Sequence, residues 1–119
     1  MPQVIIHISE TRDQGVKSML VKEIRQAISK TLELDTIIGQ VILYESPVAN
    51  RETHADRDPN FVFVEVFMYP GRDPALKKEL MERFFILINR HTDVDPKNIH
   101  AVIHEIPKES YFGGMMKQH

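Results

Sequence analysis

The 119-residue chain has no cysteine, little net charge and no long hydrophobic run. The lack of cysteine excludes disulfide bonds, thiolate metal sites and cysteine nucleophiles. A formal charge of −2 provides no electrostatic basis for binding nucleic acid or a membrane surface. The longest apolar stretch, residues 84–88, is too short to cross a bilayer. Because the start also lacks the basic and apolar regions of a signal peptide, we expect a cytoplasmic protein.

The remaining composition is that of an ordinary globular protein. Hydrophobic residues make up 42% of the chain and charged residues 27%. This length predicts a single domain, residues 1–119, with a modest core that oligomerisation would help to complete.

The first part of the chain reads as strand, helix, strand. Apolar residues alternate over residues 4–8, as in a half-buried strand. From Val16 to Leu32 they recur at helical spacing behind Asp13, which suits an N-cap. A second strand is predicted over residues 38–44.

The same order follows a polar segment. Residues 61–68, FVFVEVFM, predict a strand, and Asp73 followed by proline predicts the start of a helix that ends near Asn89. A turn, DVDPKN, leads into a fourth strand over residues 99–104.

The two parts align without a gap at an offset of 60 residues, which indicates an internal repeat. The matching pairs are Arg12 and Arg72, Lys17 and Lys77, Leu20 and Leu80, Ile28 and Ile88, Glu45 and Glu105, and Pro47 and Pro107. We therefore predict two pseudo-repeats, residues 1–47 and 61–114, joined by a loop over residues 48–60. That loop is rich in charge and turn formers, so it is either a solvated connection or a lid.

Two tandem β-α-β repeats predict an α/β (α+β) fold. Right-handed crossovers give each repeat a parallel strand pair with its helix on one face. Related by a pseudo-two-fold axis, the repeats form a four-stranded sheet with both helices on the same side. The strand at residues 61–68 is apolar at nearly every position, which indicates burial on both faces. Since the chain is too short to cover the second face, we predict that sheets pack together in a homo-oligomer.

Pro2 raises a separate question, because proline has no N–H for a sheet ladder and yet precedes a strand. It can simply begin the strand. Alternatively, removal of Met1 leaves Pro2 with a free secondary amine, which is a competent base when its pKa falls toward neutrality.

The ordered motifs of both repeats resemble 4-oxalocrotonate tautomerase and the fused, two-repeat members of the tautomerase superfamily. In the first repeat these are Pro2, Arg12, Lys17, Leu20, Ala27, Leu32 and Glu45, and in the second Gly71–Arg72, LKKEL, DVDPKN and HEIPKESYFGG. The resemblance implies a trimer of fused chains. It also implies an amino-terminal proline as the catalytic group and no cofactor.

Carried over by position, the resemblance makes Pro2 the catalytic residue. Arg12 and Arg72 become carboxylate-binding residues, and Tyr111, with Phe112 beside it, the aromatic wall. The second arginine of the family is replaced by Gln40 in one repeat and His100 in the other. These two are therefore candidate binding residues, and a substrate with a single carboxylate is expected.

The function implied is keto–enol proton transfer on a small keto or enol carboxylic acid. A related dehalogenase or decarboxylase and a non-catalytic, trimeric binding protein stay open as alternatives. We expect no metal, because His100 and His104 are four residues apart on a predicted strand, roughly 13 Å, too far for one ion.

Overall fold

The computed structural model describes residues 1–10, 13–35 and 38–114 of the chain. Its main elements follow the order βαββαβ, with short 3₁₀ turns after β2, before β4 and after β4. The strands are β1 (Gln3–Ser9), β2 (Gln40–Ser46), β3 (Val62–Met68) and β4 (Ile99–Glu105), and the helices are α1 (Gln14–Leu32) and α2 (Pro74–Thr92).

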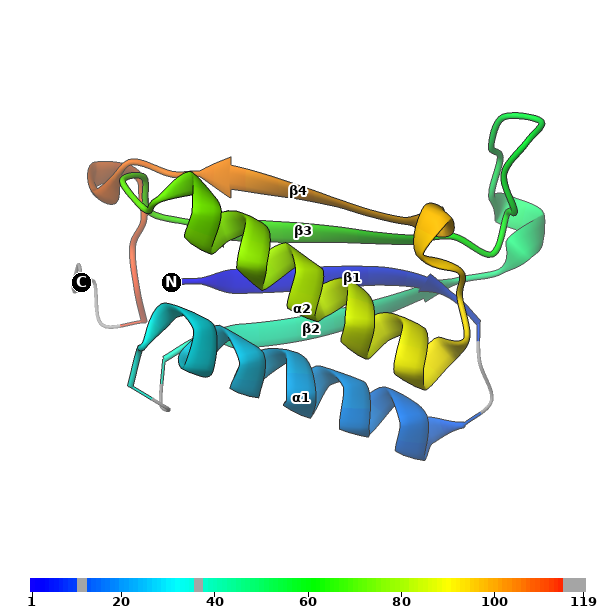
Figure 1. Ribbon diagram of the computed structural model, residues 1–119, viewed down its shortest axis with the longest axis horizontal. Helices are drawn as coiled ribbons and strands as arrows, with labels where there is room; N and C mark the ends of the chain where they lie inside the picture. Colours follow the sequence, from blue (N-terminus) through cyan, green and yellow to red (C-terminus); the bar gives the residue numbers. More distant parts are fainter. Residues whose placement is uncertain (11–12, 36–37, 115–119) are drawn as a thin grey trace.

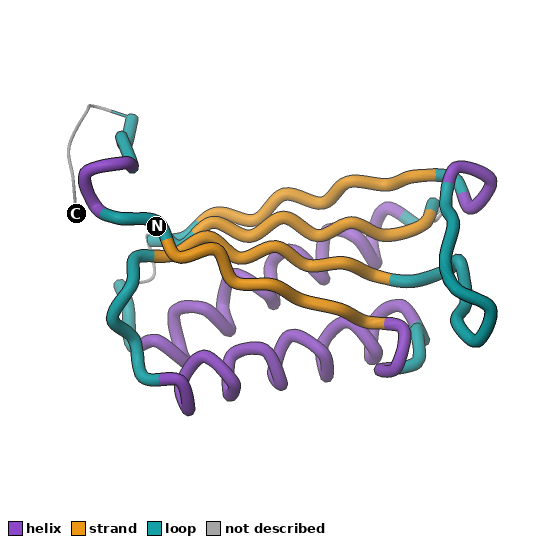
Figure 2. Tube along the Cα trace, turned by 90° about the horizontal axis from the view of Figure 1, so that it is seen from above, coloured by secondary structure: helices purple, strands orange, loops and turns teal. Residues whose placement is uncertain are grey.

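The four strands form one mixed sheet with the order β2-β1-β3-β4. The outer pairs β1–β2 and β3–β4 are parallel, and the central pair β1–β3 is antiparallel. Both helices cover the same face of this sheet (Figures 1 and 2). The predicted α+β architecture is confirmed.

Each helix is 19 residues long and begins at an aspartate N-cap. Asp13 accepts hydrogen bonds from the backbone N–H groups of residues 15 and 16, and Asp73 accepts one from residue 75. The helices end at Glu33 and Asp93, both in the left-handed conformation. Helix α2 therefore extends to Thr92, one turn beyond the predicted end near Asn89. In the described residues, no helix is long and apolar enough to span a membrane.

The core lies between the helices and the covered sheet face. Alternate residues of β1 and β3 point toward the helices, including Ile6 and Val64, which are fully buried. Phe84 of α2 is the largest fully buried side chain. One ion pair occurs in both repeats at the rim: Lys17 with Glu45 at 2.8 Å and Lys77 with Glu105 at 3.5 Å.

No element of the described residues covers the other face of the sheet (Figure 2). Its exposed apolar side chains include Ile42, Tyr44, Phe63 and Val102, contributed by β2, β3 and β4. Their strand positions alternate with the core residues, so the two faces have separate sets of apolar side chains.

We predict that truncating Phe84 destabilises the fold, whereas truncating its neighbour Ile86 does not. Phe84→Ala empties a fully buried site and should lower the free energy of unfolding by about 3–5 kcal/mol. Ile86→Ala, on the same helix but 58% exposed, should change it by less than about 0.5 kcal/mol. Urea unfolding followed by circular dichroism at one protein concentration measures both. Equal losses would contradict this assignment of the core.

Candidate active site

A cavity of about 870 Å³ opens at the end of the sheet where the chain begins. It is bounded by the first residues, the connection into β2, the turn after β3 and the carboxy-terminal segment. The lining residues are Met1, Gln3, Leu34, Ile38, Gly39, Gln40, Tyr69, Arg72, Lys108, Tyr111, Phe112, Gly113 and Gly114. Three predicted site residues, Gln40, Arg72 and Tyr111, therefore meet beside Met1.

The antiparallel central pair explains why the second repeat supplies this end. Gln3 pairs with Phe67, so the start of β1 lies beside the end of β3. The turn after β3 therefore places Arg72 in the same cavity as Met1 and Gln3. Arg12, the corresponding residue of the first repeat, lies outside the described residues.

Pro2 is buried and does not itself line the cavity, but it lies in the chain between the lining residues Met1 and Gln3. Its carbonyl accepts a hydrogen bond from the backbone N–H of Gln40 at 3.3 Å. Gly39, at φ 104°, makes the turn that brings β2 to this position. The Met1 amino group shares the site, and burial lowers the pKa of that amino group below its usual value.

The charge of the lining is of one sign. Arg72 and Lys108 are its charged side chains, and the described lining includes no aspartate, glutamate or histidine. The Nε atom of Arg72 is buried without a hydrogen-bond partner among the described residues. The site is therefore suited to an anion, and a carboxylate can pair with a guanidinium through two hydrogen bonds.

Two tyrosines form an aromatic wall. The Tyr111 hydroxyl accepts a hydrogen bond from Gln3 Nε2 at 3.0 Å, and its ring meets the Tyr69 ring edge-on at 6.0 Å between centroids. The Lys108 ammonium lies 5.6 Å from the centre of the Tyr69 ring. Sequence reasoning missed Tyr69 and Lys108. The position of Tyr69 directly after the second repeat's first strand was the signal that could have identified it.

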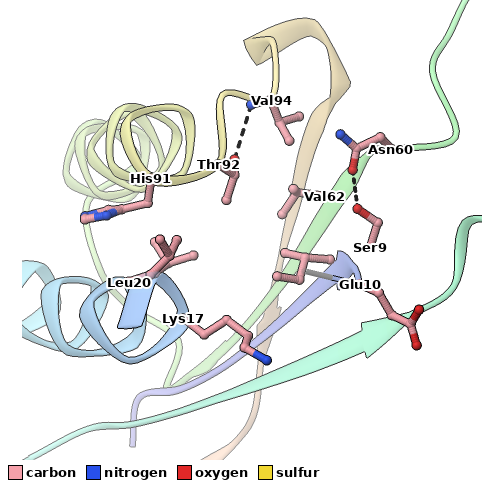
Figure 3. A pocket seen from close by; sticks show the side chains of 11 residues that line it. Ser9, Glu10, Lys17, Leu20, Asn60, Val62, His91, Thr92 and Val94 are labelled. Atoms are coloured by element: carbon pink, nitrogen blue, oxygen red, sulfur yellow. Dashed lines mark hydrogen bonds between the residues drawn. The ribbon is translucent and has the colours of Figure 1, made fainter. Parts of the chain in front are cut away.

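The opposite end of the sheet has a smaller cavity of about 260 Å³ (Figure 3). Val62 stands at this end, at the repeat position of Pro2. Ser9 donates a hydrogen bond to Asn60 there, and Lys17 and His91 line the same space (Figure 3). With valine in place of proline, this cavity has no amine of the Pro2 type.

His100 lies toward that opposite end. It pairs with Phe63, which in turn faces His7, four residues along β1 from Gln3. Within one chain, His100 therefore lies away from the Pro2 end of the sheet, and its role as a binding residue stays a prediction. The loop over residues 48–60 also leaves the sheet at the end away from the amino terminus, so it is not a lid over the Pro2 cavity of its own chain (Figure 1).

A polar cluster lies at the centre of the uncovered sheet face. His7 Nε2 is 2.8 Å from one carboxylate oxygen of Glu65, and His104 Nε2 is 3.2 Å from the other. His7 stacks between Tyr44 and Phe63. The described residues contain no group of three or more histidine, aspartate or glutamate side chains that could hold a metal ion.

The comparisons with known proteins agree with the fold. A family profile described as Tautomerase enzyme matches residues 41–112, more than half of the chain. The protein belongs to this tautomerase family. No curated protein matches the sequence.

Solved structures show the same fold at low sequence identity. A fused 4-OT wild type symmetric trimer superposes with a TM-score of 0.90 at 20% identity, covering 98% of this chain and 94% of that chain. FG41 malonate semialdehyde decarboxylase, inhibited by 3-bromopropiolate, superposes with a TM-score of 0.80 at 15% identity, covering 94% of this chain and 88% of that chain. The macrophage migration inhibitory factor-like protein of Entamoeba histolytica superposes with a TM-score of 0.82 at 14% identity, covering 99% of this chain and 98% of that chain. The chain is thus similar to fused, two-repeat tautomerase-fold proteins.

We predict that protonation of Glu65 lowers the free energy of unfolding at acidic pH. The hydrogen bond from His7 lowers the pKa of the Glu65 carboxyl, with a smaller contribution from His104 and an opposing one from burial. A folded-state pKa below the unfolded value gives stability at neutral pH that is lost as pH falls below about 4.3 through the folded value.

Glu65→Gln removes this titration, so its free energy of unfolding should fall less steeply than that of the wild type in this acidic range. The control is Glu79→Gln, on the exposed surface of α2, which should keep the wild-type slope. Urea unfolding at a series of pH values measures all three proteins. A wild-type slope for Glu65→Gln would contradict the role of the cluster.

Proposed function

We propose that this protein is a tautomerase that transfers a proton between the keto and enol forms of a small carboxylic acid, with Pro2 as general base. The observation that carries the proposal is the cavity at the amino terminus. It combines cationic side chains with an aromatic wall, and two of its lining residues, Met1 and Gln3, flank the buried Pro2 in the chain. Among the described lining residues nothing carries a negative charge that would repel the substrate.

The base is the ring nitrogen of Pro2 once Met1 is removed. A secondary amine is a base only when neutral, and burial favours its neutral form. Burial also lowers the pKa of the Met1 amino group, which precedes Pro2 by one residue. If Met1 is retained, the Pro2 nitrogen is an amide and cannot accept a proton. The protein would then be a non-catalytic binding protein.

Arg72 is the proposed carboxylate-binding residue. Its unpartnered Nε atom and planar guanidinium can hold a carboxylate in the cavity. Tyr111 belongs to the aromatic wall of the cavity. Gln40 also lines the cavity and provides a neutral side-chain amide for hydrogen bonding. Arg12 stays a prediction from the sequence, since it lies outside the described residues.

An isomerase is favoured over a dehalogenase or decarboxylase that activates water. In this proposal Pro2 takes the substrate proton, so water activation would need a second general base, commonly a carboxylate, near the substrate. The described lining contains neither aspartate nor glutamate. Proton transfer within the substrate needs only the amine and groups that stabilise the enolate.

The proposal includes assembly as a homotrimer. The exposed apolar side chains of the sheet provide a surface for packing against other copies. Structures described as fused 4-OT trimers, which share the fold at TM-scores of 0.87 to 0.90, support the number of copies.

The proline mechanism predicts that activity depends on both the processing and the identity of residue 2. Intact mass of protein from its native host should show loss of Met1. Pro2→Ala should lower kcat for phenylpyruvate or 2-hydroxymuconate tautomerisation by about 10²–10⁴-fold, because general base catalysis contributes this much. A form that retains Met1 is the matched control, since it keeps the fold and blocks the nitrogen. Full activity of either protein would exclude Pro2 as the base.

The carboxylate role predicts a selective effect of Arg72. Arg72→Ala should lower kcat/KM by about tenfold to a hundredfold, because the charge-assisted contact with the substrate is lost. Arg83→Ala is the control, an exposed arginine of α2 on the groove between the two helices. It should retain wild-type kinetics. Similar losses in both variants would point to overall charge rather than to a carboxylate site.

A further inference from the structure

Two buried polar atoms among the residues that line the cavity have no hydrogen-bond partner among the described residues. One is the Arg72 Nε atom, and the other is the Tyr69 hydroxyl. The carboxylate-binding role explains the first, but nothing in that role uses the second. Tyr69 and Arg72 flank the same turn after β3, so both belong to one short segment.

The ring of Tyr69 has packing contacts, whereas its hydroxyl has no hydrogen-bond partner among the described residues. Tyr111 contacts the ring edge-on at 6.0 Å, and Lys108 lies 5.6 Å from its centre. The hydroxyl of Tyr111, by contrast, already accepts the Gln3 amide at 3.0 Å. Of the two tyrosines in the wall, Tyr111 has one hydrogen bond at its hydroxyl, whereas the Tyr69 hydroxyl has none among the described residues.

A buried hydroxyl without a partner destabilises a protein, because it has lost water and gained nothing in return. Such a group is retained where a ligand completes it. Gln40 also lines the cavity, but its side chain is exposed and can bond to water. Tyr69 therefore gains more from a ligand oxygen than Gln40 does.

We propose that Tyr69 is a catalytic residue that donates a hydrogen bond to the carbonyl oxygen of a 2-oxo acid whose carboxylate binds Arg72. This assignment rests on the proposed function and adds its missing enolate-stabilising group. The carbonyl and carboxylate of a 2-oxo acid are on adjacent carbons. Tyr69 and Arg72 are three residues apart on one turn, both line the cavity, and each has a polar atom without a partner among the described residues.

The proton transfer then proceeds without a net change in Tyr69. The Pro2 nitrogen removes a proton from the carbon next to the carbonyl, and the C–H electron pair becomes the C=C bond. The carbonyl π electrons move onto oxygen, where the Tyr69 O–H stabilises the negative charge. The proton on Pro2 is then delivered to that oxygen, which gives the enol and restores the amine.

The first test is kinetic. Tyr69→Phe keeps the ring and both ring contacts but removes the donor, so kcat for phenylpyruvate tautomerisation should fall by about 10²-fold with little change in KM. Tyr44→Phe, the same change on the uncovered sheet face, is the matched control and should be neutral. Unchanged kcat in Tyr69→Phe would overturn the assignment.

The second test does not depend on turnover. Oxamate and propionate are both monoanions of similar size, but only oxamate has a carbonyl next to its carboxylate. Calorimetric titration of the wild type should show a preference for oxamate of about tenfold, which Tyr69→Phe abolishes while propionate binding is kept. Arg72→Ala should weaken both ligands.

The two tests separate this assignment from the proposed function. An inactive wild type that still shows the Tyr69-dependent preference for oxamate would remove the tautomerase function and keep the binding role. An active wild type without that preference, or with a preference that survives in Tyr69→Phe, would remove Tyr69 and keep Pro2.

Discussion

The antiparallel pairing of β1 with β3 is the constraint on which the rest of the molecule depends. Each repeat by itself is a parallel strand pair with one helix, too small to bury the apolar side of its strands. Joining the first strands side by side puts Val4 opposite Val66 and Ile6 opposite Val64. The two half-cores then become one, with Phe84 and the other buried helix residues packed over both.

The same pairing gives the molecule two chemically different ends. Opposite directions of β1 and β3 bring the start of one repeat beside the helix-entry turn of the other. Arg72 therefore shares a cavity with Met1 and Gln3, the neighbours of Pro2, and Val62 occupies the corresponding place at the far end. Tyr111 and Arg51 occupy equivalent positions of the two repeats and also differ in role. Tyr111 lines the larger cavity, whereas Arg51 donates hydrogen bonds to backbone carbonyls of the segment that follows it. The repeat is symmetric in backbone and asymmetric in chemistry.

The uncovered face has a different organisation from the covered one. Its apolar residues surround a carboxylate held by two imidazoles, so the face includes a central polar group as well as a hydrophobic surface. A buried polar group is tolerated when its hydrogen bonds are satisfied. Glu65 has such bonds to both histidines, which makes this face compatible with burial in an assembly.

Local signals in the sequence determined the elements, their order and the repeat. Asp13 and Asp73 cap the helices, and alternation marks the strands, because these effects act over a few residues. The repeat offset also placed the equivalent residues correctly, since Lys17–Glu45 and Lys77–Glu105 form matching pairs. From these signals the fold could be predicted. Three lining residues of the cavity, Gln40, Arg72 and Tyr111, were instead expected from the resemblance to the tautomerase family.

The composition of the site was decided by tertiary structure. Whether Arg72 or His100 lies beside Pro2 depends on strand direction and register between segments about 60 residues apart, and residue periodicity contains no information on either. Tyr69 and Lys108 were missed for the same reason. Tyr69 follows β3 and Lys108 follows β4, and both lie near the start of β1 only because β3 runs antiparallel to β1. Periodicity identifies which face of an element is buried, whereas the pairing of distant strands determines which ends meet.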